Sequence, residues 1–282
     1  MTPGPTTGES ENAPSVSARR SFLRGGLLGG VVGVTGGMAA GMLFESEPKA
    51  VVVPPRPAEP IEKPLPEGAH LSYAQFGEDL IANSLFYSIN ITKPTYMDVG
   101  AYEPIISNNT YFFYQRGARG LLVEPNVAFT EKLKATRPGD TVLAAGIGIT
   151  DVAEADYYVM SQPQQSTFDK AHAEKFVREK GCKIERVVKM PLININRAMT
   201  EHFKGTAPDY LSIDVEGLEF AILKTIDFKR FRPKVICIET LVANTLKHNP
   251  EITAYMTSPD RGYEVRGMSY PNTFYMDKQL LK

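Results

Sequence analysis

Tyr96-Met97-Asp98-Val99-Gly100-Ala101 is the stretch that decides how the rest of the sequence is interpreted. Strand-forming and apolar residues run into an acid and then a glycine, which predicts a buried strand whose carboxyl end reaches a ligand. A second apolar run, at residues 120–123, ends in the same way at Glu124. The interval between the two acids accommodates a loop, a helix and a return strand. The pattern therefore predicts a βαβ unit of an α/β fold, with Glu124 at the tip of its second strand, where such folds bind a ribose.

The turn after the first strand indicates which nucleoside this unit binds. Dinucleotide sites need several glycines and a free helix N-terminus against the pyrophosphate, whereas residues 100–104 contain one glycine and an acid, Glu103. We expect Glu103 to repel a pyrophosphate, which favours a cationic nucleoside without phosphate groups. S-adenosylmethionine has both properties, because it offers a ribose diol to Glu124 and a sulfonium that tolerates carboxylates and aromatic faces. The alternative is a structural βαβ unit with exposed acids.

A second informative site lies at residues 210–217, where an apolar strand rises to Asp214 and the following turn carries Glu216. Two carboxylates at this spacing can share a ligand or a metal ion, or raise each other's pKa so that one serves as a base. Alternatively, Glu216 favours the N-terminus of the next helix and Asp214 binds backbone amides. A further strand at 234–238 ends in Glu239. Four strands are thus expected to place acids along one rim of one sheet: Asp98, Glu124, Asp214 and Glu239.

Apolar periodicity and turn residues predict the remaining elements. Helices are expected at 80–86, from the polar cluster 107–110 to about 114, at 128–135, at 169–180 and at 218–226. Strands are expected at 141–145 and 155–160, with a turn at 146–148 between them, and residues 263–265 and 272–276 form an antiparallel pair.

Composition excludes several classes of protein. The chain has 282 residues and a formal net charge of −1, with no dense basic block that would recruit nucleic acid. Its cysteines, Cys182 and Cys237, form no disulfide framework and no metal-binding spacing. Histidines 70, 172, 202 and 248 are not spaced as metal ligands either. The sequence alone therefore assigns no metal ligands, although a metal that bridges Asp214 and Glu216 stays open.

The first 70 residues differ from the rest. Residues 1–24 are expected to be disordered and end in a twin-arginine motif, RRSFLR at 19–24, and residues 25–44 carry no charge. Together they resemble a bacterial twin-arginine export signal, and the apolar segment is just long enough to span a bilayer. Residues 45–70 form a Pro-rich linker. We expect membrane association in a bacterium through residues 25–44. The side of the membrane stays open, with export as one alternative and an apolar tail on a soluble enzyme as another.

Five segments, in this order, resemble the FkbM family of S-adenosylmethionine-dependent methyltransferases: YAQFGED (73–79), DVGA (98–101), SNNT (107–110), EPN (124–126) and SIDVEG (212–217). The resemblance covers roughly residues 71–276 and implies a methyltransferase domain at 71–282. It implies the class I methyltransferase fold, Rossmann-like, with a seven-stranded, mostly parallel sheet whose last strand is antiparallel and helices on both faces. It also implies methyl transfer to an oxygen, on a sugar, a glycan or a small natural product.

The resemblance further implies which residues form the site. The donor S-adenosylmethionine is expected to contact Gln75, Asp98, Gly100, Tyr102, Asn109 and Glu124, with Asp98 and Gly100 at its methionine end and Glu124 on the ribose. Asp214 and Glu216 are expected to face the acceptor as catalytic residues. One departure is Ala74, where the family more often has serine. Two other function classes stay open: an NAD-linked sugar-modifying enzyme built on the same βαβ unit, and a non-catalytic exported protein that retains the fold.

Overall fold

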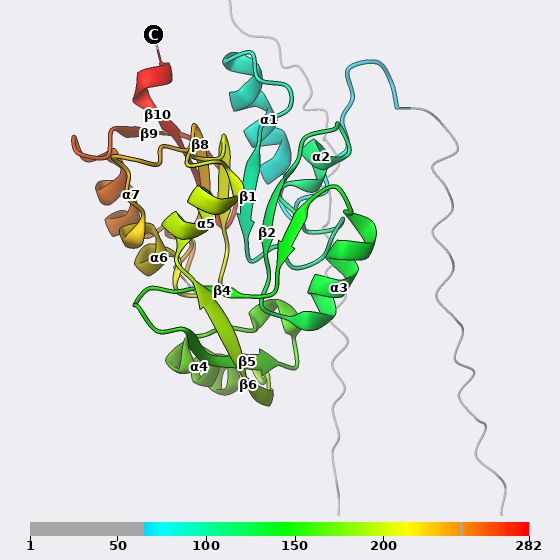
Figure 1. The fold of residues 1–282 in the computed structure, drawn as a ribbon, viewed down its shortest axis with the longest axis vertical. Coiled ribbons are helices and arrows are strands. Elements are labelled where there is room, and N and C mark those ends of the chain that lie inside the picture. The colour runs from blue at the N-terminus through cyan, green and yellow to red at the C-terminus, as the bar shows by residue number, and fades with distance from the viewer. Residues whose placement is uncertain (1–64, 243–244, 282) are drawn as a thin grey trace, which may run out of the picture. The chain divides into compact units, whose positions relative to one another are not determined.

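The computed structural model describes residues 65–242 and 245–281 (Figure 1). The expected disordered start at 1–24, the apolar segment at 25–44 and the linker up to residue 64 lie outside the described residues. In the described part of the chain, no helix has both the length and the apolar character needed to cross a membrane.

The described residues form a seven-stranded sheet in the order β3-β2-β1-β7-β8-β10-β9. Its strands in chain order are β1 (Tyr96–Val99), β2 (Gly120–Val123), β3 (Thr141–Leu143), β7 (Tyr210–Ile213), β8 (Val235–Glu239), β9 (Tyr263–Met268) and β10 (Asn272–Asp277). The first five strands pair in parallel, whereas β10 is antiparallel to both β8 and β9. The expected seven-stranded, mostly parallel sheet is confirmed, and its last strand along the chain is the antiparallel one.

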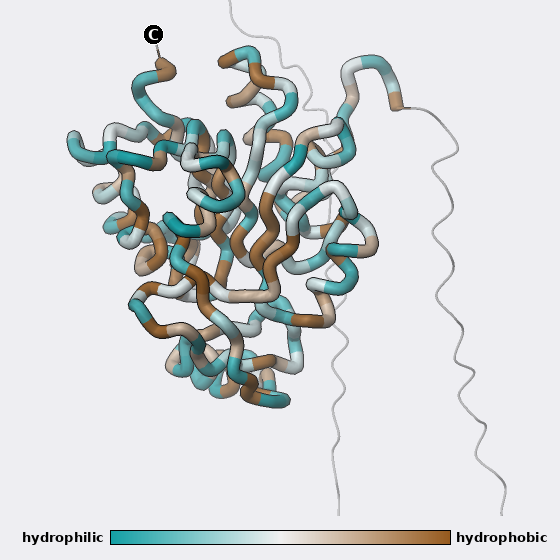
Figure 2. The backbone as a smooth tube through the Cα atoms, in the orientation of Figure 1, coloured by the Kyte–Doolittle hydropathy of each residue, from teal (hydrophilic) through white to brown (hydrophobic). Residues whose placement is uncertain are grey.

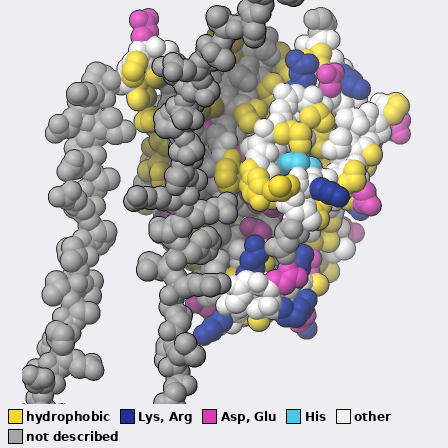
Figure 3. All heavy atoms as spheres, turned by 180° about the vertical axis from the view of Figure 1, so that it is seen from behind, with side chains coloured by type: hydrophobic (Ala, Val, Ile, Leu, Met, Phe, Trp, Pro, Cys, Tyr) yellow, Lys and Arg dark blue, Asp and Glu magenta, His cyan; other side chains and the backbone are white. Residues whose placement is uncertain are grey.

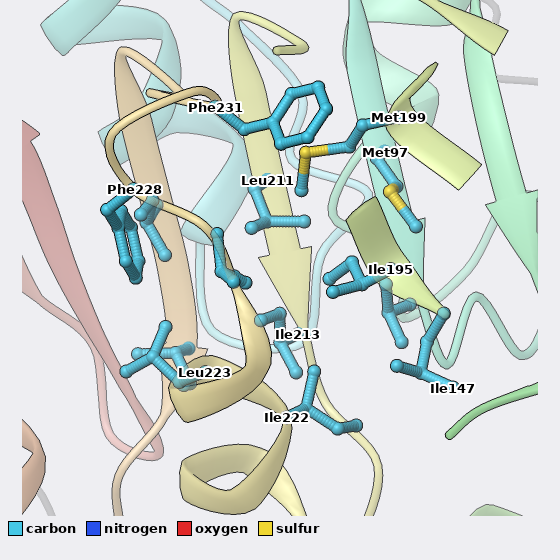
Figure 4. Close-up of a cluster of buried hydrophobic side chains, with 14 of the residues drawn as sticks. Met97, Ile147, Ile195, Met199, Leu211, Ile213, Ile222, Leu223, Phe228 and Phe231 are labelled. Atoms are coloured by element: carbon cyan, nitrogen blue, oxygen red, sulfur yellow. The ribbon is translucent and has the colours of Figure 1, made fainter. Parts of the chain in front are cut away.

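Helices cover both faces of this sheet, as Figure 1 shows. On one face lie α1 (Glu78–Ser88), α2 (Tyr111–Tyr114) and α3 (Val127–Thr136), and on the other lie α5 (Ile195–His202), α6 (Glu219–Thr225) and α7 (Pro250–Thr257). Side chains alternate between the faces along each strand, so Met97 and Val99 pack with α5 and α6 while Tyr96 packs with α1 and α2. Figure 4 shows the first of these two cores, and Figure 2 shows the hydrophobic strands at the centre of the domain.

A second, three-stranded sheet has the order β4-β6-β5. It contains β4 (Gly146–Ile147), β5 (Glu154–Met160) and β6 (Ile184–Ile193), and carries the short 3-10 helix η1 (Pro163–Gln165) and α4 (Lys170–Lys180). We refer to these elements, residues 146–193, as the arm. The hydroxyl of Thr167 donates to the carbonyl of Glu216 at 3.0 Å, which fixes the arm to the turn after β7. The arm therefore lies beyond the carboxyl ends of the parallel strands, at the lower end of Figure 1.

The arm contains the main differences from the sequence prediction. The expected turn at 146–148 is wrong for Gly146 and Ile147, which pair in parallel with Leu192 and Ile193 of β6. Strand β5 is confirmed, but it belongs to the second sheet. Strand β6 and helix α5 were not predicted, because the charged and exposed residues of β6 leave no continuous apolar run. Helix α4 is confirmed, with Asp169 capping its N-terminus through the amides of residues 171 and 172.

One buried cation holds the first half of the domain together. The guanidinium of Arg137, after α3, is fully buried and pairs with Asp140 at 2.7 Å. It also donates to the Oδ1 of Asn108 at 2.9 Å, the hydroxyl of Tyr96 at 3.0 Å and the hydroxyl of Thr110 at 3.1 Å. These partners come from β1, from the loop before α2 and from the turn before β3. Each of the three guanidinium nitrogens therefore donates to at least one acceptor, as a buried guanidinium requires.

Charges of both signs are interspersed over the visible part of the face in Figure 3. No basic patch stands out there, in keeping with the net charge of −1.

Replacing Arg137 by methionine is expected to lower the free energy of unfolding by about 3–5 kcal/mol, because Asp140 would keep a buried charge without its partner. Urea unfolding followed by circular dichroism measures this loss. A matched control is Arg197→Met, because Arg197 forms an exposed ion pair with Glu201 on α5 and its removal should cost less than about 1 kcal/mol. Equal losses in the two variants would contradict the role given to Arg137.

Candidate functional site

Sheet register brings the acids of the sequence motifs together. Ile213 of β7 lies opposite Val99 of β1 and Ile238 of β8, so the next residues along, Gly100, Asp214 and Glu239, form a row at the carboxyl edge. Strand β10 extends the row, because Asn272 lies directly opposite Glu239. Alternation places the side chains of Asp214, Glu239 and Asn272 on the sheet face that α1 and α2 cover. Asp98 shares that face two residues before Gly100 along β1.

Gly100 allows β1 and β7 to approach each other at this edge. Its φ is +85°, and a Cβ on it would overlap the carbonyl oxygen of Asp214. A residue with a side chain is therefore excluded both by the left-handed backbone and by the contact. Gly217 has the same double constraint in the next turn, where φ is +114° and a Cβ would meet the imidazole of His172.

Glu124 is held with its carboxylate at the edge of a cavity. The backbone N–H of Tyr102 donates to one oxygen at 2.9 Å, and that of Asn126 donates to the other at 2.7 Å. Each oxygen keeps a lone pair for a further donor. Burial raises the pKa of Glu124 to about 7, although both backbone hydrogen bonds oppose this rise.

Asp98 is only 3% exposed. It accepts a hydrogen bond from the hydroxyl of Thr110 at 2.8 Å, and Thr110 in turn contacts Arg137. Burial raises the pKa of Asp98, and the hydrogen bond from Thr110 opposes the rise. The amide of Asn109 donates to the hydroxyl of Ser212 at 3.1 Å, which links the loop before α2 to β7.

Four carboxylates gather where β7, α6 and β8 meet: Asp214, Glu216, Glu219 and Glu239. Burial raises the pKa of each of them, and it is the largest cause in each case. For Asp214, Glu216 and Glu239, repulsion from the neighbouring carboxylates raises the pKa further. Glu219 is the one that backbone amides hold, since Val215 and Gly217 donate to it at 3.0 Å. Binding of backbone amides was one of the two roles that the sequence left open for Asp214.

Three adjoining cavities open around this edge. The first, with about 580 Å³ of empty volume including solvent at its mouth, has Glu124 and apolar walls such as Val123, Pro125 and Ile147. The second lies towards α4 and includes His172, Phe176 and Lys180. The third lies between the first strands and the loop after β9, and includes Gln75, Asp98, Asn109 and Tyr270. Below they are called the first, second and third cavities.

Glu216 lines all three cavities. Its φ is +59°, a left-handed conformation that is costly for a residue with a side chain. Tyr102, at the corresponding place after β1, has φ +51°. Such conformations persist where the surrounding structure imposes them, and they cluster at functional sites.

The structure thus places all eight predicted site residues around connected cavities. Gly100, Tyr102, Asp214 and Glu216 line both the first and the third cavity, Glu124 lines the first, and Gln75, Asp98 and Asn109 line the third. Their individual roles stay predictions. Glu103, however, forms an ion pair with Lys132 at 2.7 Å and lines none of these cavities. The negative charge that disfavours a pyrophosphate comes from Asp98 and Asp214 instead.

Three polar residues of the site were not assigned from the sequence: Glu219, Glu239 and Asn272. Glu239 was recognised as the fourth acid at a strand end, but no role was given to it. Glu219 was missed because an acid in the first turn of a helix is common and does not by itself indicate a site. Asn272 starts an antiparallel strand, so the rule about carboxyl ends does not find it.

Comparison with models of known protein families identifies the family to which the chain belongs. A family model described as "Methyltransferase FkbM domain" matches residues 98–265, which confirms the resemblance drawn from the motifs. Comparison with curated proteins gives no match.

Several solved structures are similar at low identity. A putative methyltransferase, yhhF from Escherichia coli, is 14% identical with a TM-score of 0.36, covering 76% of this chain and 88% of that one. TehB from Haemophilus influenzae is 10% identical with a TM-score of 0.40, covering 73% and 64%. A putative caffeoyl-CoA O-methyltransferase from Staphylococcus aureus is 8% identical with a TM-score of 0.39, covering 71% and 82%. Scores this low carry no argument about function.

Gly100→Ala is expected to destabilise the protein more than Gly181→Ala does. Both glycines have a positive φ, but a Cβ on Gly181 would meet nothing within 4 Å, so that variant should lose only about 1–2 kcal/mol for the left-handed backbone. Gly100→Ala adds the overlap with Asp214, worth about 1–3 kcal/mol more. Urea unfolding of the two variants gives the difference, and equal losses would show that the close approach of β1 and β7 is not required.

Proposed function

Since the chain belongs to the FkbM methyltransferase domain family and is an S-adenosylmethionine-dependent methyltransferase, we propose that it methylates a hydroxyl group. The acceptor is a sugar, a glycan or a small natural product. The observation that carries the proposal is the position of Glu216, which lines the cavity with Glu124 and both neighbouring cavities. A base in that position reaches an acceptor and a donor at the same time.

The residues of the first and third cavities fit the donor. Glu124 offers one lone pair on each oxygen to the two ribose hydroxyls, and the apolar walls of the first cavity suit the adenine. Asp98, beside Gly100, suits the cationic methionine end in the third cavity. None of the described residues that line these two cavities is a lysine or an arginine, so a pyrophosphate would lack a cationic partner there. This favours S-adenosylmethionine over NAD.

The second cavity suits the acceptor. Phe176, Leu246 and Tyr270 give it apolar and aromatic walls, and His172 and Lys180 add polar groups. Tyr270 is half exposed, so its ring can pack against a sugar. A hydroxyl in this cavity lies beside Glu216 and Glu239.

When bound, S-adenosylmethionine supplies an electrophilic methyl group on its sulfonium. The residues of this chain align the acceptor oxygen with that group, and Asp214 or Glu216 takes the hydroxyl proton. Alignment supplies much of the rate, and a positioned base contributes about 10²- to 10⁴-fold. The left-handed backbone at Glu216 holds its carboxylate at the junction of the cavities.

Donor affinity is expected to rise with pH through the titration of Glu124. Burial raises its pKa to about 7, so the carboxyl is largely protonated at pH 6 and ionised at pH 8, and the ionised form accepts the ribose hydroxyls more strongly. Glu124→Gln should abolish this rise and weaken binding at pH 8 by about 1.5–3 kcal/mol.

Calorimetry of the full chain at pH 6, 7 and 8, with S-adenosylmethionine and separately with NAD, measures these effects. Glu131→Gln is the control, because Glu131 is exposed on α3, the helix that follows Glu124 along the chain. No heat of binding and no thermal shift with the methyl donor would refute the proposed function, and binding of NAD alone would favour the NAD-linked sugar-modifying enzyme.

Asp214→Asn and Glu216→Gln test the base. At least one of them is expected to lower methylation by about 100-fold or more, while donor affinity stays within about threefold. Each variant is returned to cells that lack the gene and are fed methionine with a deuterated methyl group, and labelled envelope glycans and small metabolites are measured by mass spectrometry. Glu174→Gln, on the exposed side of α4, is the control. Unchanged product in both site variants would rule out a base at either position.

A further inference from the structure

Three of the four clustered carboxylates converge on one point. One oxygen each from Asp214, Glu219 and Glu239 lies within 4.8 Å of the other two. Asp214 follows β7, Glu219 is the first residue of α6, and Glu239 ends β8. Because these positions belong to two strands and a helix start, the oxygens are held by regular structure rather than by a long loop.

The described residues supply no cationic side chain to this cluster. None of the ion pairs in the described part of the chain includes Asp214, Glu219 or Glu239. Buried carboxylates this close cannot all be ionised without compensation, and the compensation is either shared protons or a bound cation. The cluster alone does not distinguish these two cases.

The side chain of Asn272 favours a bound cation. Its side chain is 3% exposed, and its Oδ1 has no hydrogen-bond partner. Its amide nitrogen donates to Glu78 at 3.2 Å, which fixes the orientation, since the flipped amide would turn its oxygen towards the Glu78 carboxylate. Asn272 lies directly opposite Glu239 on the same sheet face and lines the third cavity together with Asp214 and Glu239. A buried amide oxygen without a donor is costly, and this one belongs to a residue that lines the same cavity as Asp214 and Glu239.

Glu219 is also arranged as a ligand. Backbone amides of Val215 and Gly217 donate to its Oε1, which fixes the direction of the carboxylate and leaves a lone pair on Oε2 for a ligand. Carboxylate and amide oxygens without sulfur or imidazole are the ligands of hard divalent cations.

We propose that Asp214, Glu219, Glu239 and the Oδ1 of Asn272 bind one divalent cation of the oxygen-preferring kind, Mg²⁺ or Mn²⁺. This differs from a metal bridging Asp214 and Glu216, because Glu216 stays free to act as the base. Glu219, Glu239 and Glu216 line the second cavity, so the cation borders the space proposed for the acceptor. Resting on the proposed function, a bound cation would hold the acceptor oxygen, Glu216 takes the hydroxyl proton, and the oxygen takes the methyl group as the bond between that methyl carbon and sulfur breaks.

Mn²⁺ serves as the probe, with the full chain purified, treated with a chelator and titrated without S-adenosylmethionine. Electron paramagnetic resonance counts free Mn²⁺, and we expect one bound ion per chain that Mg²⁺ displaces. Glu239→Gln and Asn272→Ala should each weaken Mn²⁺ binding about tenfold or more. Glu216→Gln is the matched control, a neighbouring acid outside the ligand set, and it should keep the single site.

The outcomes separate the two proposals. A folded wild-type chain, checked by circular dichroism, that binds no Mn²⁺ would overturn the cation site and leave shared protons as the compensation. A site that Glu239→Gln and Asn272→Ala both leave intact would overturn it as well. Because the titration contains no methyl donor, Mn²⁺ binding without affinity for S-adenosylmethionine would reject the proposed function alone. Affinity for S-adenosylmethionine without Mn²⁺ binding would reject the cation site alone.

Discussion

The buried guanidinium of Arg137 is the constraint on which the first half of the domain depends. A cation removed from water needs every one of its donors satisfied, and this one takes its acceptors from β1, from the loop before α2 and from the turn before β3. Those segments can adopt only the arrangement in which all the acceptors face it. Thr110 belongs to this set and also binds Asp98, so the same charge that fixes the fold fixes one wall of the third cavity.

The rim of acids could be predicted because two simple rules act together. Parallel strands end at the same edge of a sheet, and alternation sends every second residue to the same face. These rules find Asp98, Glu124, Asp214 and Glu239 from apolar runs that end in an acid. They fail for Asn272, because β10 runs the other way and brings its first residue to that edge. They also fail for Glu103, whose direction depends on an ion pair with Lys132.

The arm was predicted only in part for a different reason. Strand β6 is exposed along much of its length, so it lacks the apolar run by which a buried strand is recognised. Gly146 and Ile147 look like a turn locally, and only their partners in β6, distant in the sequence, make them a strand. Long-range pairing of this kind is not encoded in any short window of residues. By contrast, α4 carries its own boundaries, with Asp169 at its start and Gly181 at its end.

The junction between the arm and the turn at Glu216 has a consequence for how such enzymes diversify. The arm enters and leaves the domain between β3 and α5, and it lines all three cavities without supplying any strand of the main sheet. Its length and side chains can therefore be exchanged while the seven-stranded sheet and its row of acids stay as they are. Selection for a new acceptor can then act on the arm residues that line the second cavity, such as His172, Phe176 and Lys180, while the row of acids on the sheet is kept.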